Sequence, residues 1–151
     1  MVSDQEVPKV CYDIAGRIRG ESLIPLKILY VRYDKEENRC MIGFIEQDTY
    51  LIVKEIQKKH PEEEITVDQY TSILLYDLNR KIATLALRKL PGDYEEIYIP
   101  EECGREDRSC EVKMYYGDEF DRELYFRVPS ISLDRAMSVI SDFFISGTTW
   151  E

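Results

Sequence analysis

The side chains that could do acid–base chemistry or bind metal ions gather in two acidic clusters late in the chain. These carboxylates are Glu101, Glu102, Glu106 and Asp107 in the first cluster and Asp118, Glu119 and Asp121 in the second. A calcium loop needs oxygen ligands at alternate positions, a glycine at the bend and a late bidentate glutamate, and neither cluster has that spacing. A catalytic carboxyl group would need an apolar pocket, whereas these groups are flanked by other charges. We therefore expect solvated carboxylates, with neither a catalytic nor a metal site.

Other residue types that carry chemistry are rare or badly spaced. His60 is the single histidine, and we interpret it as a helix-terminal residue because nothing near it in sequence completes a Ser/His/Asp or Cys/His site. The cysteines are too scattered for zinc. The phosphate-binding pattern G-x-x-x-x-G-K is absent. We predict that the protein is not an enzyme and needs no cofactor.

The negative charge of the chain is concentrated in one window. The net charge is −10, and residues 91–126 hold 12 acidic and 4 basic side chains, which accounts for −8 of it. Such a field repels nucleic acid and attracts a basic partner. The alternative is that these residues form solvated loops that keep the protein soluble.

Length and composition favour an ordinary globular domain. The chain has 151 residues, of which 44% are hydrophobic, and no apolar run approaches the roughly 18 residues of a membrane span. Residues 1–8 lack the basic and apolar regions of a signal peptide, so we expect a cytoplasmic protein. In that compartment Cys11, Cys40, Cys103 and Cys110 should be free thiols, although a short loop could join the last two.

Hydrophobic periodicity predicts an α+β domain over residues 26–151, preceded by a segment, 1–25, of uncertain structure. We expect an antiparallel sheet of about five to seven strands with two main helices packed on it. Alternating or continuous apolar runs predict strands over residues 26–33, 40–45, 66–77, 81–89 and 94–99. The central two, 66–77 and 81–89, have the apolar runs typical of strands buried on both faces. A helix is predicted over 47–60, with Asp48 as its N-cap and Pro61 after its end.

The last third of the chain, residues 110–150, has the strongest pattern. Val112, Met114 and Tyr116 alternate with polar residues, a Gly117 turn follows, and residues 123–128 alternate again. We expect Pro129 to end this second strand because proline has no N–H to donate. A helical face then follows, formed by Leu133, Ala136, Met137, Ile140, Phe143 and Phe144.

The outer face of this hairpin is the candidate binding surface. Tyr115 and Tyr125 lie opposite the apolar faces of their strands, and tyrosine is enriched at protein interfaces. Nearby acidic groups would steer a basic protein toward them. The predicted partner-binding residues are Glu101, Glu102, Glu106, Asp107, Tyr115, Asp118, Glu119, Asp121, Glu123 and Tyr125. The alternative is that the tyrosines pack under the helices.

The last third of the chain is predicted to form a strand, a Tyr-Gly turn, a second strand and a helix that ends in Phe-Phe-x-x-Gly before a tryptophan. This order resembles immunity protein family 1 of bacterial polymorphic toxin systems. The matching residues are Tyr116, Gly117, Val128, Pro129, Ala136, Phe143, Phe144, Gly147 and Trp150. Members of that family are small cytoplasmic proteins that bind and neutralise a toxin domain. The resemblance implies no catalytic residues.

These observations predict an immunity protein, or antitoxin, that occludes a basic toxin domain, most simply a nuclease, through an acidic surface bearing tyrosines. The alternative is a structural or regulatory interaction domain without a toxin partner, such as a homodimer joined through exposed sheet edges. We predict no binding to nucleic acid or to a membrane.

Overall fold

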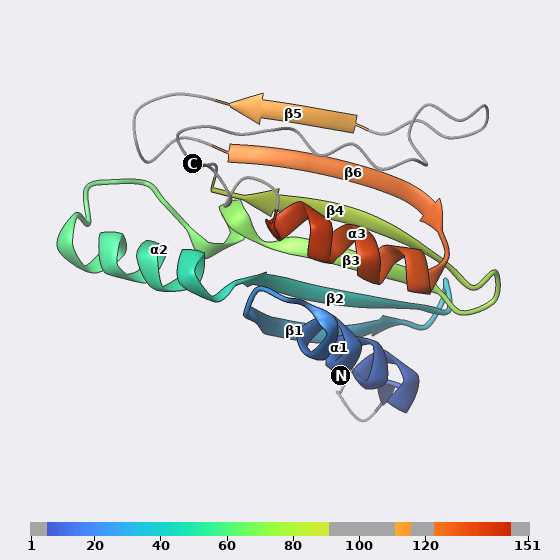
Figure 1. Cartoon of the computed structure of the whole chain (residues 1–151). Helices are drawn as coiled ribbons and strands as arrows, with labels where there is room; N and C mark the ends of the chain where they lie inside the picture. The colour runs from blue at the N-terminus through green and yellow to red at the C-terminus, as the bar shows by residue number, and fades with distance from the viewer. Residues whose placement is uncertain (1–5, 91–110, 116–122, 146–151) are drawn as a thin grey trace.

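The computed structural model describes residues 6–90, 111–115 and 123–145. Within them the chain forms three α-helices and one six-stranded sheet in the order β1-β2-β3-β4-β6-β5 (Figure 1). Every neighbouring pair of strands is antiparallel. The predicted α+β fold with an antiparallel sheet is therefore confirmed, with one helix more than expected. The strand predicted over 94–99 lies outside the described residues.

The described strands, α2 and α3 follow the predicted order, and α1 and η2 are additional. In chain order the elements are α1 (Lys9–Glu21), β1 (Leu26–Asp34), β2 (Arg39–Glu46), α2 (Gln47–Lys59), the short 3-10 helix η2 (Val67–Tyr70), β3 (Ser72–Asp77), β4 (Ile82–Lys89), β5 (Glu111–Tyr115), β6 (Glu123–Ile131) and α3 (Leu133–Ile145). The strand predicted over 66–77 is thus shorter, because Thr66 caps η2 by accepting a hydrogen bond from the backbone N–H of Gln69. Asp48 lies in the first turn of α2 and is not its N-cap, which is Glu46.

The N-terminal segment contributes a helix to the core. Cys11, Ile14, Ala15 and Ile18 follow the spacing of one helical face, and all four are buried in α1. This face packs on β1 and β2, beside α3. Figure 1 shows α1 and α3 on the same side of the sheet. Residues 9–21 therefore join the domain as a helix and not as a strand.

A disulfide bond joins Cys11 of α1 to Cys40 of β2. Their Cα atoms are 5.4 Å apart, and both residues are fully buried. The prediction of free thiols was wrong for this pair. Each cysteine belongs to the apolar face of its own element, so packing the two faces together places the sulfur atoms within bonding distance. Cys103 and Cys110 lie outside the described residues.

Among the described residues, α1 and α3 cover one face of the sheet, while α2 packs only at one end of the other face. In β4, Ala83, Leu85 and Leu87 are buried under α3, while the alternate residues Ile82 and Thr84 are half-buried on the other face. The expectation that β4 is buried on both faces was wrong. Its apolar run reflects small and aliphatic residues on the uncovered face, which an antiparallel sheet can leave exposed to water.

Helix α3 forms as predicted and closes the core. The Ser132 hydroxyl accepts a hydrogen bond from the backbone N–H of Arg135 at 3.1 Å, which caps the helix start. Five of the six residues of its predicted apolar face are buried, and Leu133 packs at the margin of the core. Phe143 and Phe144 meet edge to face with ring centroids 5.0 Å apart. The helix therefore has a structural role in the covered half of the sheet.

Strand β6 continues through Pro129 to Ile131, so the prediction that Pro129 ends it was wrong. Leu85 pairs with Val128 and Ala83 pairs with Ile131, which leaves two residues of β6 opposite Thr84. This is a bulge, where a ladder hydrogen bond from Pro129 is not needed. Ser130 adopts a positive φ of 53°, and its N–H donates to the Thr84 hydroxyl at 3.3 Å.

A second, smaller core lies at the end of β2, where α2 extends beyond the sheet (Figure 1). Ile45, Val53, Ile56, Ile65 and Tyr70 form this cluster. It holds α2 against η2 and so fixes the position of η2 at the rim of the uncovered face. Among the described residues, no helix combines the length and the apolar character that crossing a membrane requires.

Candidate binding surface

The face of the sheet opposite α1 and α3, which we call the uncovered face, carries no α-helix over its central strands within the described residues. Strand register assigns Tyr30 and Gly43 to it as one cross-strand pair, and Gly43 and Ile73 as the next. The same face carries Ala86 opposite Ile73, followed by Arg127 opposite Ala86. This row therefore runs from an aromatic residue on β1, through small and aliphatic residues on β2 to β4, to an arginine on β6.

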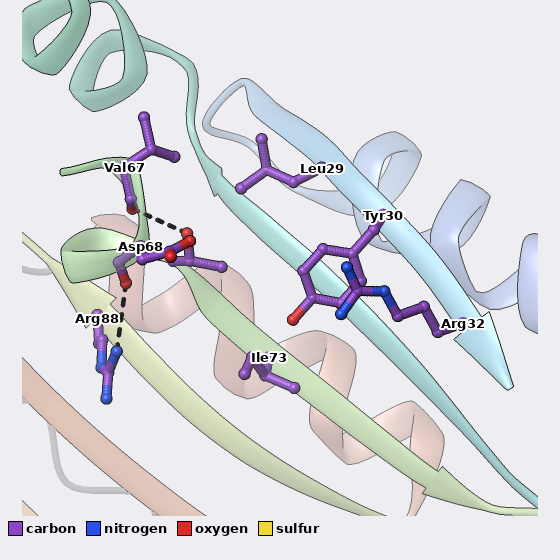
Figure 2. Close-up of a pocket in the computed structure, with 8 residues that line it drawn as sticks. Leu29, Tyr30, Arg32, Val67, Asp68, Ile73 and Arg88 are labelled. Atoms are coloured by element: carbon purple, nitrogen blue, oxygen red, sulfur yellow. Dashed lines mark hydrogen bonds between the residues drawn. The ribbon is translucent and has the colours of Figure 1, made fainter. Parts of the chain in front are cut away.

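A hollow of about 520 Å³ opens on this face between η2 and strands β1, β3 and β4. Its floor is apolar, with Leu29, Ile73 and Val67, and its charged rim is formed by Arg32, Arg88 and Asp68. Figure 2 shows these side chains around the hollow. The Arg88 guanidinium donates a hydrogen bond to the backbone carbonyl of Asp68 at 3.3 Å, which ties β4 to η2. This volume falls in the usual range of ligand pockets, about 300–1,000 Å³.

The aromatic part of the hollow is a stacked arrangement on β1 and β2. The Tyr30 ring lies across Gly43, where the absence of a side chain leaves room for it. The Arg32 guanidinium lies over the Tyr30 ring, 4.0 Å from its centroid. Figure 2 shows these two side chains next to each other. A cation at this distance is attracted by the electrons of the ring. Gly43 thus positions Tyr30, and Tyr30 positions Arg32.

Replacing Gly43 by alanine should displace this stack. A methyl group at Gly43 would overlap the Tyr30 ring, with the ring Cδ2 only 2.9 Å from the new carbon. We expect the free energy of unfolding to fall by about 1–3 kcal/mol, as for other overpacked sites. Chemical denaturation of Gly43→Ala measures this loss.

The control for this substitution is the same change in a Tyr30→Ala background. There the methyl group has space, so the additional cost of Gly43→Ala should be close to zero. An equal cost in both backgrounds would show that Tyr30 does not lie over Gly43.

A second hollow of about 200 Å³ lies on the same face toward the other end of the strands. Arg39, Arg80 and Arg127 line it together with Asp77, Leu75 and Thr84. Arg39 pairs with Asp34 at 3.4 Å, and its Nε is buried without an acceptor within the described residues. The two hollows together bring five arginines and two aspartates to one face.

Most of the predicted partner-binding residues lie outside the described part of the chain. They are Glu101, Glu102, Glu106, Asp107, Asp118, Glu119 and Asp121. Tyr115 is the last residue of β5 and pairs in register with Glu123, the first residue of β6. Tyr125 is half-buried on the uncovered face, with the Arg88 guanidinium 5.4 Å from its ring centroid. Tyr125 therefore does not pack under the helices.

Two ion pairs on helix surfaces shift the pKa values of their partners. A hydrogen bond from Lys59 lowers the pKa of Glu55, and a hydrogen bond to Glu21 raises the pKa of Arg17. Both are ion pairs on exposed or partly exposed helix surfaces, where such pairs are common. No group of three or more His, Cys, Asp or Glu side chains within the described ranges could hold a metal ion.

The arginines of the uncovered face are the functional candidates that sequence analysis missed. They come from five separate places, positions 32, 39, 80, 88 and 127, so no local motif connects them. A signal was present in the period-two pattern, because Arg32 alternates with apolar residues in β1 and Arg127 does so in β6. Only the strand order and register show that these arginines lie on the same face of the sheet.

Comparison with known protein families, curated proteins and solved structures found no match to the chain.

Proposed function

We propose that the protein is an immunity-type binding protein that neutralises a basic toxin domain at the β5 edge of its sheet. The observation that supports this proposal is the place of β5 at the end of the strand order, directly between the two acidic clusters in sequence. Glu101, Glu102, Glu106 and Asp107 precede it, and Asp118, Glu119 and Asp121 follow it.

An edge strand suits this purpose physically. Within the described residues β5 pairs with β6 alone, so its other side presents backbone groups that a partner strand can pair with. Glu123 and Tyr125 on the adjacent β6 belong to the same end of the sheet. Carboxylates on both sides of the edge would draw in a positively charged protein and fix its orientation.

The proposed action is occlusion, without chemistry by this chain. A nuclease binds its substrate in a basic cleft, because nucleic acid is a polyanion. Acidic side chains from residues 101–123 would fill such a cleft and exclude the substrate, with Tyr115 and Tyr125 as apolar anchors. No cofactor takes part in this mechanism.

The test measures the association rate of this protein with a basic toxin domain, such as one encoded immediately upstream of its gene. The rate constant should fall about tenfold or more between about 0.05 M and about 0.5 M salt, because salt screens the attraction. The variant Asp118→Asn/Glu119→Gln should associate more slowly at low salt. The control, Glu36→Gln/Glu37→Gln, removes two exposed charges at the β1–β2 turn and should not alter the rate.

The electrostatic mechanism would be contradicted by a tight complex whose association rate constant changes neither with salt concentration nor in the Asp118→Asn/Glu119→Gln variant. Failure to bind any basic toxin domain would contradict the proposal as a whole.

The second candidate function is a homodimeric interaction domain. It is favoured by β1, a nine-residue strand at the opposite edge that pairs with β2 alone in the described sheet. A dimer in light scattering of the isolated protein would support it.

The compartment is part of the same proposal. An immunity protein that meets its toxin inside the cell would act in the cytoplasm, whereas the disulfide between Cys11 and Cys40 is of a kind that persists in oxidising surroundings. Because this bond is fully buried, access to reductants is restricted in the folded state. The redox state of this pair in cell extracts therefore bears directly on the compartment.

A further inference from the structure

We propose that the uncovered face of the sheet is a second docking surface, which binds an acidic polypeptide segment carrying apolar side chains. We call it the arginine face and define it by Arg32, Arg39, Arg80, Arg88 and Arg127 with the floor between them. It adjoins the β5 edge at β6, where Arg127 pairs in register with Glu111 of β5, and its proposal does not depend on a toxin partner.

The net charge of this face is opposite in sign to the net charge of the whole chain. Five arginines and two aspartates line its two hollows and Asp34 pairs with Arg39, which leaves an excess of two positive charges, while the chain carries a net −10. Such a concentration on one face of an acidic protein creates a local field that attracts anionic groups. The occupant should therefore be acidic, the opposite of the partner proposed for the β5 edge.

Several of these guanidinium groups are available to an anion. Arg32, Arg80 and Arg127 are exposed, and their side chains make no ion pair within the described residues. Arg32 is held in place by the Tyr30 ring, which leaves the edge of its planar fork free. A fixed guanidinium fork matches a carboxylate with two parallel hydrogen bonds.

The floor of the face requires an occupant with apolar side chains as well. Ile73 lies in the first hollow and Leu75 in the second, two residues apart on β3. Side chains two residues apart on a strand are separated by about 7 Å, which is the spacing of alternate side chains in an extended peptide. An extended peptide with two apolar residues at alternate positions would place them in the two hollows, and acidic residues at the next alternate positions on either side would face the arginines.

Nucleic acid fits this face less well. Single-stranded nucleic acid binds to sheets by stacking its bases on exposed aromatic rings. Here the Arg32 guanidinium covers the Tyr30 ring at 4.0 Å, and the Arg88 guanidinium lies 5.4 Å from the Tyr125 ring. The net charge of −10 also repels a long polyanion more strongly than a short acidic segment.

The experiment uses the full chain and a fluorescein-labelled ten-residue peptide whose alternate positions hold glutamate, leucine, tyrosine and glutamate, with serine between them. Fluorescence anisotropy should detect binding that a peptide with glutamine in place of glutamate does not show. Arg32→Glu and Arg127→Glu should each weaken binding about tenfold or more, because each replaces an attraction by a repulsion. The matched control is Arg19→Glu, which makes the same change on the exposed side of α1, across the sheet.

Thermal unfolding of each variant verifies that the fold is kept, as expected for exposed side chains. Absence of binding by the acidic peptide, or equal binding by Arg32→Glu and the unmodified protein, would overturn the proposal. So would tighter binding of a labelled oligothymidylate that is lost in the same variants, since the face would then bind nucleic acid. Self-association that Arg127→Glu abolishes would also overturn it, because the occupant would be a second copy of the chain.

Discussion

Replacing Phe144 by alanine should lower the free energy of unfolding by about 3–5 kcal/mol, the largest single effect that we expect in this protein. Phe144 is fully buried in α3. Its ring meets Phe44 of β2 edge to face at 6.3 Å and Phe143 at 5.0 Å. The substitution would leave a cavity between α3 and the centre of the sheet, and the surrounding strands can close it only in part.

Urea denaturation followed by circular dichroism measures this loss. The control is Leu51→Ala in α2, where the side chain is 54% exposed and the change should stay within about 0.5 kcal/mol. A loss below about 1 kcal/mol for Phe144→Ala would contradict the position of α3 on the sheet, because a fully buried phenylalanine cannot be removed at so small a cost.

Reducing the bond between Cys11 and Cys40 should destabilise the protein by about 3–4 kcal/mol. The two residues are separated by 29 positions, and closing a loop of that length restricts the unfolded chain far more than the folded one. The bond also fastens α1 to β2 across the main core. Loss of the bond should therefore weaken the attachment of α1 before the sheet itself unfolds.

The measurement compares unfolding curves with and without a thiol reductant, after peptide mapping has established which cysteines are linked. The control is the double variant Cys11→Ala/Cys40→Ala, whose stability should not respond to the reductant. Mapping that finds Cys11 and Cys40 as free thiols in the purified protein, or curves that coincide with and without reductant, would contradict the assignment.

Both predictions depend on how much of the fold follows from local sequence. The alternation in residues 26–33 and the helical spacing from Leu133 to Phe144 were sufficient to predict β1 and α3. Such patterns are reliable because each element must bury one continuous face, and the positions of that face are set by the period of the backbone.

Predictions from the local sequence pattern failed at positions whose structure depends on a contact with a residue distant in sequence. Pro129 remains in β6 because Thr84, 45 positions earlier, faces a bulge there. Lys89 is 3% exposed at the end of β4, since its Nζ donates to the backbone carbonyl of Phe143 at 2.7 Å near the end of α3. A cation is stabilised at a helix C-terminus, but nothing in the sequence near Lys89 indicates that a helix end lies there.

The sequence alone therefore determined the fold class, helices α2 and α3, the strands of the described sheet, and the acidic window that motivates a basic partner. Only the tertiary structure decided that Cys11 and Cys40 are joined, that α1 and α3 lie on the same face of the sheet, and that five arginines lie on the opposite face. The physical reason is the range of the interactions. Backbone periodicity acts over a few residues, whereas charges and sulfur atoms distant in sequence come together only when strand order and register are set.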